Sequence, residues 1–153
     1  MNRLYLRLGI AALGIGVTTA LAVAQEHAAP AAQERTAPTT NAQVYFIAPL
    51  DGATLHGAVE VRFGLKGMGI APAGVKFDGT GHHHLLIDTD SSELKMDAAI
   101  PASDKIVHFG KGQTETVLNL GRGKHTLELV FADYLHRSFD PPVHSKKITI
   151  TVN

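Results

Sequence analysis

The chain of 153 residues contains no cysteine, and its 14 Lys and Arg residues balance its 14 Asp and Glu residues. The absence of Cys excludes disulfides, thiolate nucleophiles, iron–sulfur clusters and Cys-ligated blue-copper sites. A net charge of zero gives no electrostatic reason to expect a nucleic-acid partner. A hydrophobic content of 44% is enough for one packed domain, and nine histidines in so short a chain indicate a bound metal.

Residues 1–24 have the pattern of a secretory signal peptide. Arg3 and Arg7 begin it, an apolar run follows, and Ala22-Val23-Ala24 has the small residues of a cleavage site. The apolar run is short for a membrane span and contains Gly, which weakens a helix. Contact with a membrane is therefore expected only through this segment, and only if it stays uncleaved. We expect the protein in the periplasm.

The next segment, residues 25–43, is rich in Ala, Thr and Pro and has no hydrophobic periodicity, which predicts a flexible leader. The folded domain is expected over residues 44–153. It contains short runs of β-branched, aromatic or alternating apolar residues, separated by turn residues, as strands with one buried face do. The predicted strands are Val44–Ile47, Val59–Leu65, His82–Asp88, Lys105–Phe109, Thr114–Leu120, His125–Ala132 and Lys146–Val152.

About seven short strands without a convincing helix predict an all-β fold. The spacing of the turn signals favours an immunoglobulin-like antiparallel β-sandwich, with a small β-barrel as the alternative. We interpret Gly121–Lys124 as a tight hairpin turn, and Pro141-Pro142 as part of a loop before the last strand.

The triplet His82-His83-His84 opens a predicted strand. Because side chains alternate along a strand, His82 and His84 are expected on one face and His83 on the other. Two residues along a strand span about 6.6–6.8 Å, which lets two imidazoles converge on one ion if further ligands come from elsewhere. The alternative is that one member of the triplet is a hydrogen-bonded core histidine and the others are solvated.

Further ligands must come from other segments that meet the triplet in space. His108, in a predicted strand, and His136, in the loop after the last hairpin, are the preferred partners. The candidate metal ligands are therefore His82, His84, His108 and His136. The remaining candidates are weaker. His56 and His125 are expected at the surface, and a ligand role for His144 is left open. Asp133 and Asp140 are expected either to orient an imidazole or to cap their loop.

Imidazole ligands without thiolate suit zinc, Cu(II) or nickel. Copper is our preferred ion, and zinc is the alternative. A second copper site is also considered: if cleavage follows Ala24, the mature chain begins Gln25-Glu26-His27. Its amine, backbone amides and imidazole form the tetragonal nitrogen set that Cu(II) and Ni(II) prefer.

Several stretches of the domain together resemble a bacterial exported family of unassigned function. The resemblance covers about Val44 to Val152 and implies a single small β-sandwich behind a signal peptide, without implying an activity. The stretches are IAPLDGATLHG (Ile47–Gly57), FGLKGMGIAPAG (Phe63–Gly74), TGHHHLLID (Thr80–Asp88), HFGKGQTE (His108–Glu115) and GKHTLELV (Gly123–Val130).

Three functions are compatible with these residues. We favour a periplasmic metal-binding protein that carries, buffers or delivers copper, with an envelope protein as a candidate recipient. The alternative is a non-enzymatic interaction module of the cell envelope, in which the histidine cluster is structural. A metal-dependent enzyme ranks third because no acid–base pair is visible beside the cluster, so we expect no catalytic residues.

Overall fold

The computed structural model describes residues 34–153. The predicted signal peptide and residues 25–33 of the predicted leader, including His27, lie outside the described residues. Among the residues that are described, no helix is long and apolar enough to cross a membrane. The only helical element in this part of the chain is η1, a short 3₁₀ turn at Ser91–Glu93.

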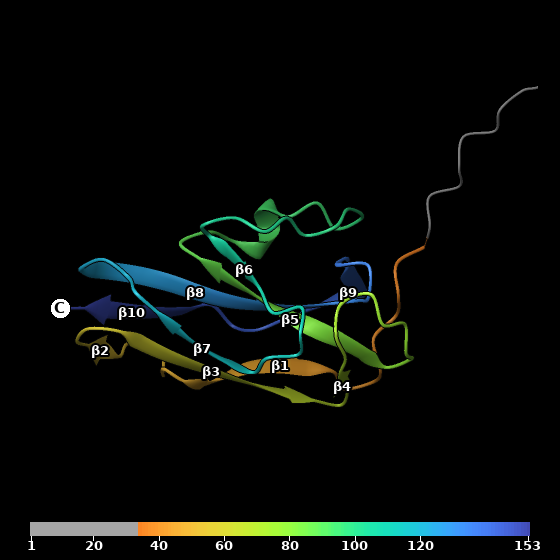
Figure 1. Cartoon of the computed structure of the whole chain (residues 1–153), viewed down its shortest axis with the longest axis horizontal. Coiled ribbons are helices and arrows are strands. Elements are labelled where there is room, and N and C mark those ends of the chain that lie inside the picture. The colour runs from red at the N-terminus through yellow and green to blue at the C-terminus, as the bar shows by residue number, and fades with distance from the viewer. Residues whose placement is uncertain (1–33) are drawn as a thin grey trace, which may run out of the picture. The chain divides into compact units, whose positions relative to one another are not determined.

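Two β-sheets form the domain (Figure 1). The smaller sheet has the order β1-β3-β7 and is antiparallel, with β1 at Gln43–Ala48, β3 at Val59–Lys66 and β7 at Glu115–Leu118. The larger sheet has the order β2-β10-β8-β5-β4, with β6 paired to β5 and β9 paired to β8. Its strands are β2 (Thr54–Leu55), β4 (Gly69–Ile70), β5 (Thr80–Ile87), β6 (Ile106–His108), β8 (Gly123–Ala132), β9 (Ser138–His144) and β10 (Ile148–Val152). The predicted all-β sandwich is confirmed.

The main core lies between the two sheets and follows from the alternation of each strand. From Val59 to Phe63 in β3 and from Leu127 to Phe131 in β8, every second residue points into the space between the sheets and is buried. Each such side chain contributes about 1.5–3 kcal/mol. The core residues from these two strands are Val59, Val61, Phe63, Leu127, Leu129 and Phe131. The sheets are therefore joined by the same apolar residues that predicted the strands.

A second, smaller core covers the opposite face of the larger sheet. Leu86 of β5 and Val130 of β8 point to this outer face, and Ile100 and Ile106 pack on them. The segment between β5 and β6, which contains η1, lies over this face (Figure 1). The outer face of β5 is thus partly shielded from water, and this shielding positions the candidate site.

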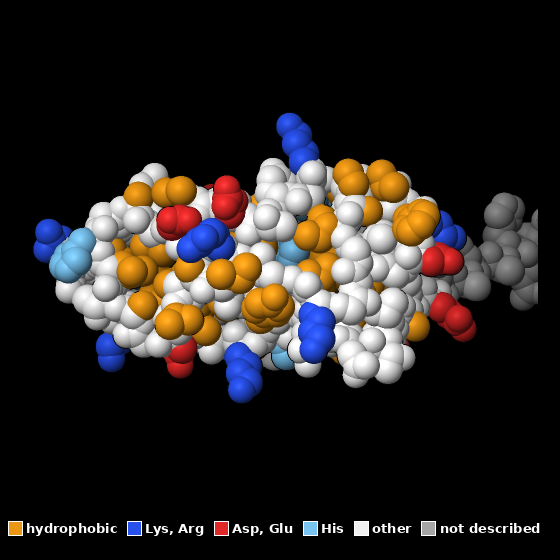
Figure 2. All heavy atoms as spheres, turned by 90° about the horizontal axis from the view of Figure 1, so that it is seen from below, with side chains coloured by type: hydrophobic (Ala, Val, Ile, Leu, Met, Phe, Trp, Pro, Cys, Tyr) orange, Lys and Arg blue, Asp and Glu red, His pale blue; other side chains and the backbone are white. Residues whose placement is uncertain are grey.

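No segment within residues 34–153 covers the outer face of the smaller sheet in this way (Figure 2). Figure 2 views the domain from this side and shows hydrophobic side chains interspersed with charged ones. Tyr45 and Val117 are 46% and 61% exposed. The candidate ligands of β5 and β6 lie in the other sheet.

Two segments differ from their sequence-based interpretation. Gly121–Lys124 does not close a hairpin, because it links β7 of the smaller sheet to β8 of the larger sheet. The predicted loop around Pro141 and Pro142 belongs to β9. The register of β9 on β8 shifts between Ser138 and Val143, so the two prolines fall between the paired stretches, where the missing N–H groups cost no ladder hydrogen bond.

Residues 34–42 form the described end of the predicted leader, and they contact the domain. Arg35 forms a salt bridge of 2.7 Å with Asp140, and the Asp140 N–H donates to the Thr36 carbonyl at 2.9 Å. The Thr39 hydroxyl donates to the Gly67 carbonyl. The packed part of the chain therefore begins before the predicted boundary at residue 44.

Candidate metal centre

The triplet on β5 alternates as predicted. His83 points into the main core, where its ring lies 4.8 Å from Phe63 and 5.0 Å from Phe131, measured between ring centroids. His82 and His84 point to the outer face of the larger sheet, and their ring centroids lie 5.0 Å apart. All three side chains have 0% exposure. One strand thus places two imidazoles on the outer face and one imidazole inside the sandwich.

His108 reaches the same place from the neighbouring strand. It is the register partner of His84 in the antiparallel pair of β5 and β6, and the two rings stack at 5.0 Å with 28° between their planes. Gly110 makes room for this ring, because a Cβ at position 110 would lie 2.3 Å from His108 Cε1. A side chain at this position would therefore displace the ring of His108.

His136 comes from the loop between β8 and β9. Its backbone adopts the left-handed conformation, with φ of 65°, and its N–H donates to the Asp133 carbonyl at 2.9 Å. The buried carboxylate of Asp133 caps this loop, since its Oδ1 accepts from the N–H groups of Leu135 and Arg137 at 2.9 and 3.0 Å. The loop is therefore held closed from inside, with His136 at its turn.

These four side chains form one cluster, which we call the histidine tetrad. Its ring centroids lie 4.7 to 6.2 Å apart, and the two extremes are His108 to His136 and His84 to His136. One ring nitrogen each of His82, His84 and His108 lies within 4.8 Å of the others, an arrangement that can hold a metal ion. The structure thus brings together all four residues that the sequence singled out: His82, His84, His108 and His136.

Five ring nitrogens of the tetrad are buried and have no partner in the part of the chain that the structure describes. Among the described residues, both nitrogens of His82, both nitrogens of His84 and Nε2 of His108 are buried without a hydrogen bond. Leaving a buried polar atom unpaired costs about 1–3 kcal/mol. A cation bound between the rings would satisfy one nitrogen of each ring.

Burial also keeps the deeper rings neutral. Burial and the neighbouring His136 and His108 lower the pKa of His82 from 6.5 to about 4. Burial, followed by the effect of His82, lowers the pKa of His84 to about 2, and burial and His136 lower the pKa of His108. A metal ligand must be a neutral imidazole. At neutral pH these three rings are therefore in the form that binds a metal.

The tetrad is closed on one side and open on the other. His82 and His84 are fully buried against the sheet, whereas His108 and His136 are partly exposed. The negative charge of Asp133 favours the protonated form of His82 and so raises its pKa, against the larger lowering by burial. The site therefore combines a buried pair of ligands, an accessible edge and one nearby carboxylate.

The spacing of the nitrogens fits a single ion after a small adjustment. Two imidazole nitrogens bound to one zinc ion at about 2.0–2.1 Å cannot be more than about 4.2 Å apart. The nitrogens of His82, His84 and His108 lie within 4.8 Å of one another. Small ring rotations that move each nitrogen by less than about an ångström would therefore bring all three to bonding distance of one ion. Four imidazoles without thiolate are a donor set for zinc or Cu(II).

Apart from His83 in the main core, the other described histidines are bonded elsewhere or exposed. Both ring nitrogens of His125 lie 2.8 Å from acceptors, Asp88 Oδ2 and the Gly121 carbonyl. His144 Nδ1 lies 3.0 Å from Glu128 Oε1, and His56 is exposed. Of the two carboxylates considered as supports for an imidazole, Asp133 caps its loop, as described above, and Asp140 pairs with Arg35.

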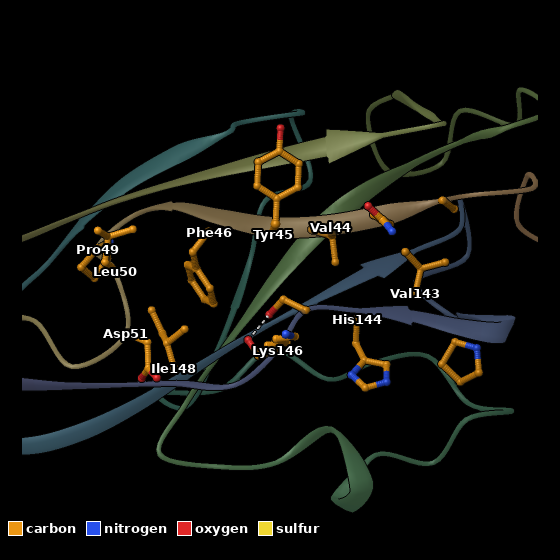
Figure 3. Close-up of a pocket in the computed structure, with 14 residues that line it drawn as sticks. Val44, Tyr45, Phe46, Pro49, Leu50, Asp51, Val143, His144, Lys146 and Ile148 are labelled. Carbon is orange, nitrogen blue, oxygen red and sulfur yellow. Dashed lines mark hydrogen bonds between the residues drawn. The ribbon is translucent and has the colours of Figure 1, made fainter.

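A separate groove of about 560 Å³ opens between β1 and the connection from β9 to β10 (Figure 3). Its walls are mostly apolar, with Val44 and Phe46 on one side and Val143 and Ile148 on the other. No member of the histidine tetrad lines it. The histidine tetrad and the groove are therefore separate sites.

Comparisons with known proteins give a family and no activity. No functionally curated protein matches the sequence. The X-ray structure of the endo-beta-1,4-mannanase from Thermotoga petrophila is similar at 18% identity and a TM-score of 0.43, over 74% of this chain and 20% of that chain. The chain thus spans about a fifth of that protein, and a likeness at this level carries no inference. Residues 61–153 match a family described as a domain of unknown function, DUF4399, and the chain belongs to that family.

Proposed function

We propose that the protein is an exported, non-enzymatic metal-binding protein of the periplasm that carries or buffers copper, with zinc as the competing ion. One observation carries the proposal: buried imidazole nitrogens from two strands converge within 4.8 Å of one another and have no partner among the described residues. Such a cluster is costly without a ligand and favourable with one.

Copper is preferred over zinc on chemical grounds. The donors are imidazoles alone, and Cu(II) binds nitrogen ligands more tightly than the other first-row divalent ions. The signal-peptide pattern of residues 1–24 supports export. The partly exposed edge at His108 and His136 is where an envelope protein that receives the metal would approach.

A titration of the mature protein without an affinity tag tests metal binding. The protein is titrated with Cu(II), Cu(I) and Zn(II) while its melting temperature is followed. An ion that binds the native state raises the melting temperature by mass action. We expect the largest rise with copper and saturation at one ion per chain. No rise with any of the three ions contradicts the proposal and leaves an interaction module with a structural histidine cluster.

Two variants of adjacent residues sharpen this test. His84→Leu removes a ligand, and His83→Leu removes an equally buried imidazole that points to the other side of the sheet. Both variants replace an unpaired buried ring by an apolar side chain, so both apo proteins are expected to fold. We expect His83→Leu to keep the metal-dependent rise in melting temperature and His84→Leu to lose it. Equal behaviour of the two variants contradicts the assignment of ligands.

The identity of the ion and the compartment need a separate measurement. The tag-free protein is isolated from the periplasmic fraction of its own cell, and its metal content is determined by elemental analysis. Copper at close to one ion per chain supports the proposal. Recovery of the protein only from the cytoplasm contradicts the proposed location in the periplasm. A protein loaded with another metal contradicts the choice of copper.

A further inference from the structure

The described N-terminal segment, residues 34–36, is bonded to the loop that carries His136. The Thr36 hydroxyl donates to Asp133 Oδ2 at 2.9 Å, and the Glu34 carbonyl accepts from Arg137 Nη2 at 3.3 Å. Beyond the loop, the Asp140 N–H donates to the Thr36 carbonyl at 2.9 Å. Residues that precede the first strand thus contact the loop at both its ends.

Asp133 links this segment to the loop backbone. Its Oδ1 accepts from the N–H groups of Leu135 and Arg137, while its Oδ2 accepts from the Thr36 hydroxyl. Arg137 Nη2 also lies 3.4 Å from Oδ2. Because the carboxylate is buried, its orientation depends on these partners, and Thr36 is the one that lies outside the loop.

His136 depends on this network more than the other members of the tetrad do. His82, His84 and His108 belong to paired strands, whose register fixes their positions. His136 instead occupies a left-handed turn position, φ 65°, in a loop. Its backbone donates to the Asp133 carbonyl, so a shift of Asp133 moves the His136 ring.

We propose that residues 34–36 act as a strap that holds His136 on the histidine tetrad, with Thr36 and Asp133 as positioning residues for retention of the metal. The proposal rests on the proposed function, because it assigns a role to the exposed edge of that same site. When Thr36 releases Asp133, the loop loosens, His136 leaves the ion, and the metal dissociates through this edge. Outer partners of metal ligands typically change affinity by about 10- to 100-fold.

The test measures how fast the loaded protein loses Cu(II), and Zn(II) in parallel, to excess EDTA. Thr36→Val removes the hydroxyl and keeps the shape of the side chain, and we expect roughly tenfold faster release. Thr36→Ser restores the hydroxyl and is expected to restore slow release. Thr39→Val is the matched control, because the Thr39 hydroxyl bonds Gly67 and not the loop. Unchanged release in Thr36→Val, or equal acceleration in Thr39→Val, overturns the strap.

A double-mutant cycle separates positioning from a general loss of stability. His136→Asn removes the imidazole while keeping a residue that tolerates the left-handed conformation. We expect His136→Asn to accelerate release, and Thr36→Val to add nothing in the His136→Asn background. Independent effects of the two substitutions, or no effect of His136→Asn, overturn the strap. Failure of the wild-type protein to bind either metal defeats the proposed function itself, whereas binding with unchanged release in Thr36→Val defeats the strap alone.

Discussion

His84 on β5 stands directly opposite His108 on β6, and their rings stack with centroids 5.0 Å apart. The pairing register of two strands therefore sets the distance between two candidate ligands. A slip of one residue would turn every side chain of β6 to the other face and place Val107 opposite His84. The geometry of the site is thus a direct consequence of how β6 pairs with β5.

The space beside His108 gives the first prediction. Gly110→Ala places a Cβ 2.3 Å from His108 Cε1, so the ring must move away from the tetrad. We expect the affinity for copper to fall by roughly tenfold, as for other changes that misplace a ligand. Gly121→Ala is the control, because its Cβ meets nothing within 4 Å. Competition with a chelator of known affinity measures both variants, and equal affinities would contradict the role of Gly110.

The second prediction concerns His83 and the stability of the apo protein. Both nitrogens of His83 are buried in the main core without a hydrogen bond from any described residue. Replacing this ring by an apolar side chain removes that cost, so His83→Leu is expected to raise the free energy of unfolding by about 1 kcal/mol. Urea denaturation of the metal-free protein measures the change. A decrease of similar size in the free energy of unfolding would contradict the prediction. It would show that the packing contacts of the His83 ring contribute more than its unpaired nitrogens cost.

The pair of His125 and Asp88 gives a prediction for pH. Hydrogen bonds to Asp88 and to the Gly121 carbonyl raise the pKa of His125 above 6.5. Partial burial of Asp88 opposes its ionisation, but the bonds from His125 and the Thr126 N–H outweigh it and lower its pKa below 3.8. The His125 contribution is present below pH 6.5 and is lost as the pH rises through its raised pKa. The Asp88 contribution is present above pH 3.8 and is lost as the pH falls through its lowered pKa.

Both contributions are therefore present between about pH 3.8 and pH 6.5. An exposed pair contributes about 0.2–1 kcal/mol. We expect wild type to exceed His125→Gln in free energy of unfolding by about 0.5 kcal/mol at pH 5.5, and this difference should shrink at pH 9. Urea denaturation at both pH values measures it, and a difference independent of pH would contradict the ion pair.

Glu128 gives a prediction for the segment that covers the second core. Its buried carboxylate accepts from the Ser91 hydroxyl at 2.6 Å and the Ser91 N–H at 3.1 Å, and it lies 3.0 Å from His144 Nδ1. Glu128→Ala leaves the Ser91 groups unpaired, and we expect a loss of about 2 kcal/mol in the free energy of unfolding. Glu128→Gln keeps an acceptor and should lose less. Hydrogen exchange should locate the added flexibility at residues 89–105, and protection unchanged there would contradict the prediction.

Much of the fold could be predicted because apolar and polar residues alternate along the main strands. β3 buries every second side chain from Val59 to Phe63, and the sequence shows that period directly. β8 instead buries six consecutive residues, because Leu127, Leu129 and Phe131 face the main core while Val130 and Ala132 belong to the second core. β9 was not predicted, because Pro141 and Pro142 remove two backbone donors, and only a bulged register on β8 accommodates them. β2 and β4 have two residues each, too few for any period.

The candidate ligands could also be predicted, but their surroundings could not. Alternation within the triplet separates His83 from its neighbours, while the approach of His108 and His136 depends on pairing between distant strands and on a loop. The cluster lies on the outer face of the larger sheet, because β6 pairs with β5 there. No local pattern marks Thr36 as a partner of Asp133, since 97 residues separate them.

The most direct test of the account is X-ray absorption spectroscopy of the mature protein loaded with one equivalent of Cu(II) or Zn(II). The account predicts a first shell of nitrogen at about 2.0–2.1 Å for zinc, with the scattering pattern of three or four imidazoles, and loss of one imidazole in His84→Leu. A first shell dominated by oxygen, or a spectrum unchanged in His84→Leu, would show that the ion binds elsewhere and would contradict the histidine tetrad as a metal centre.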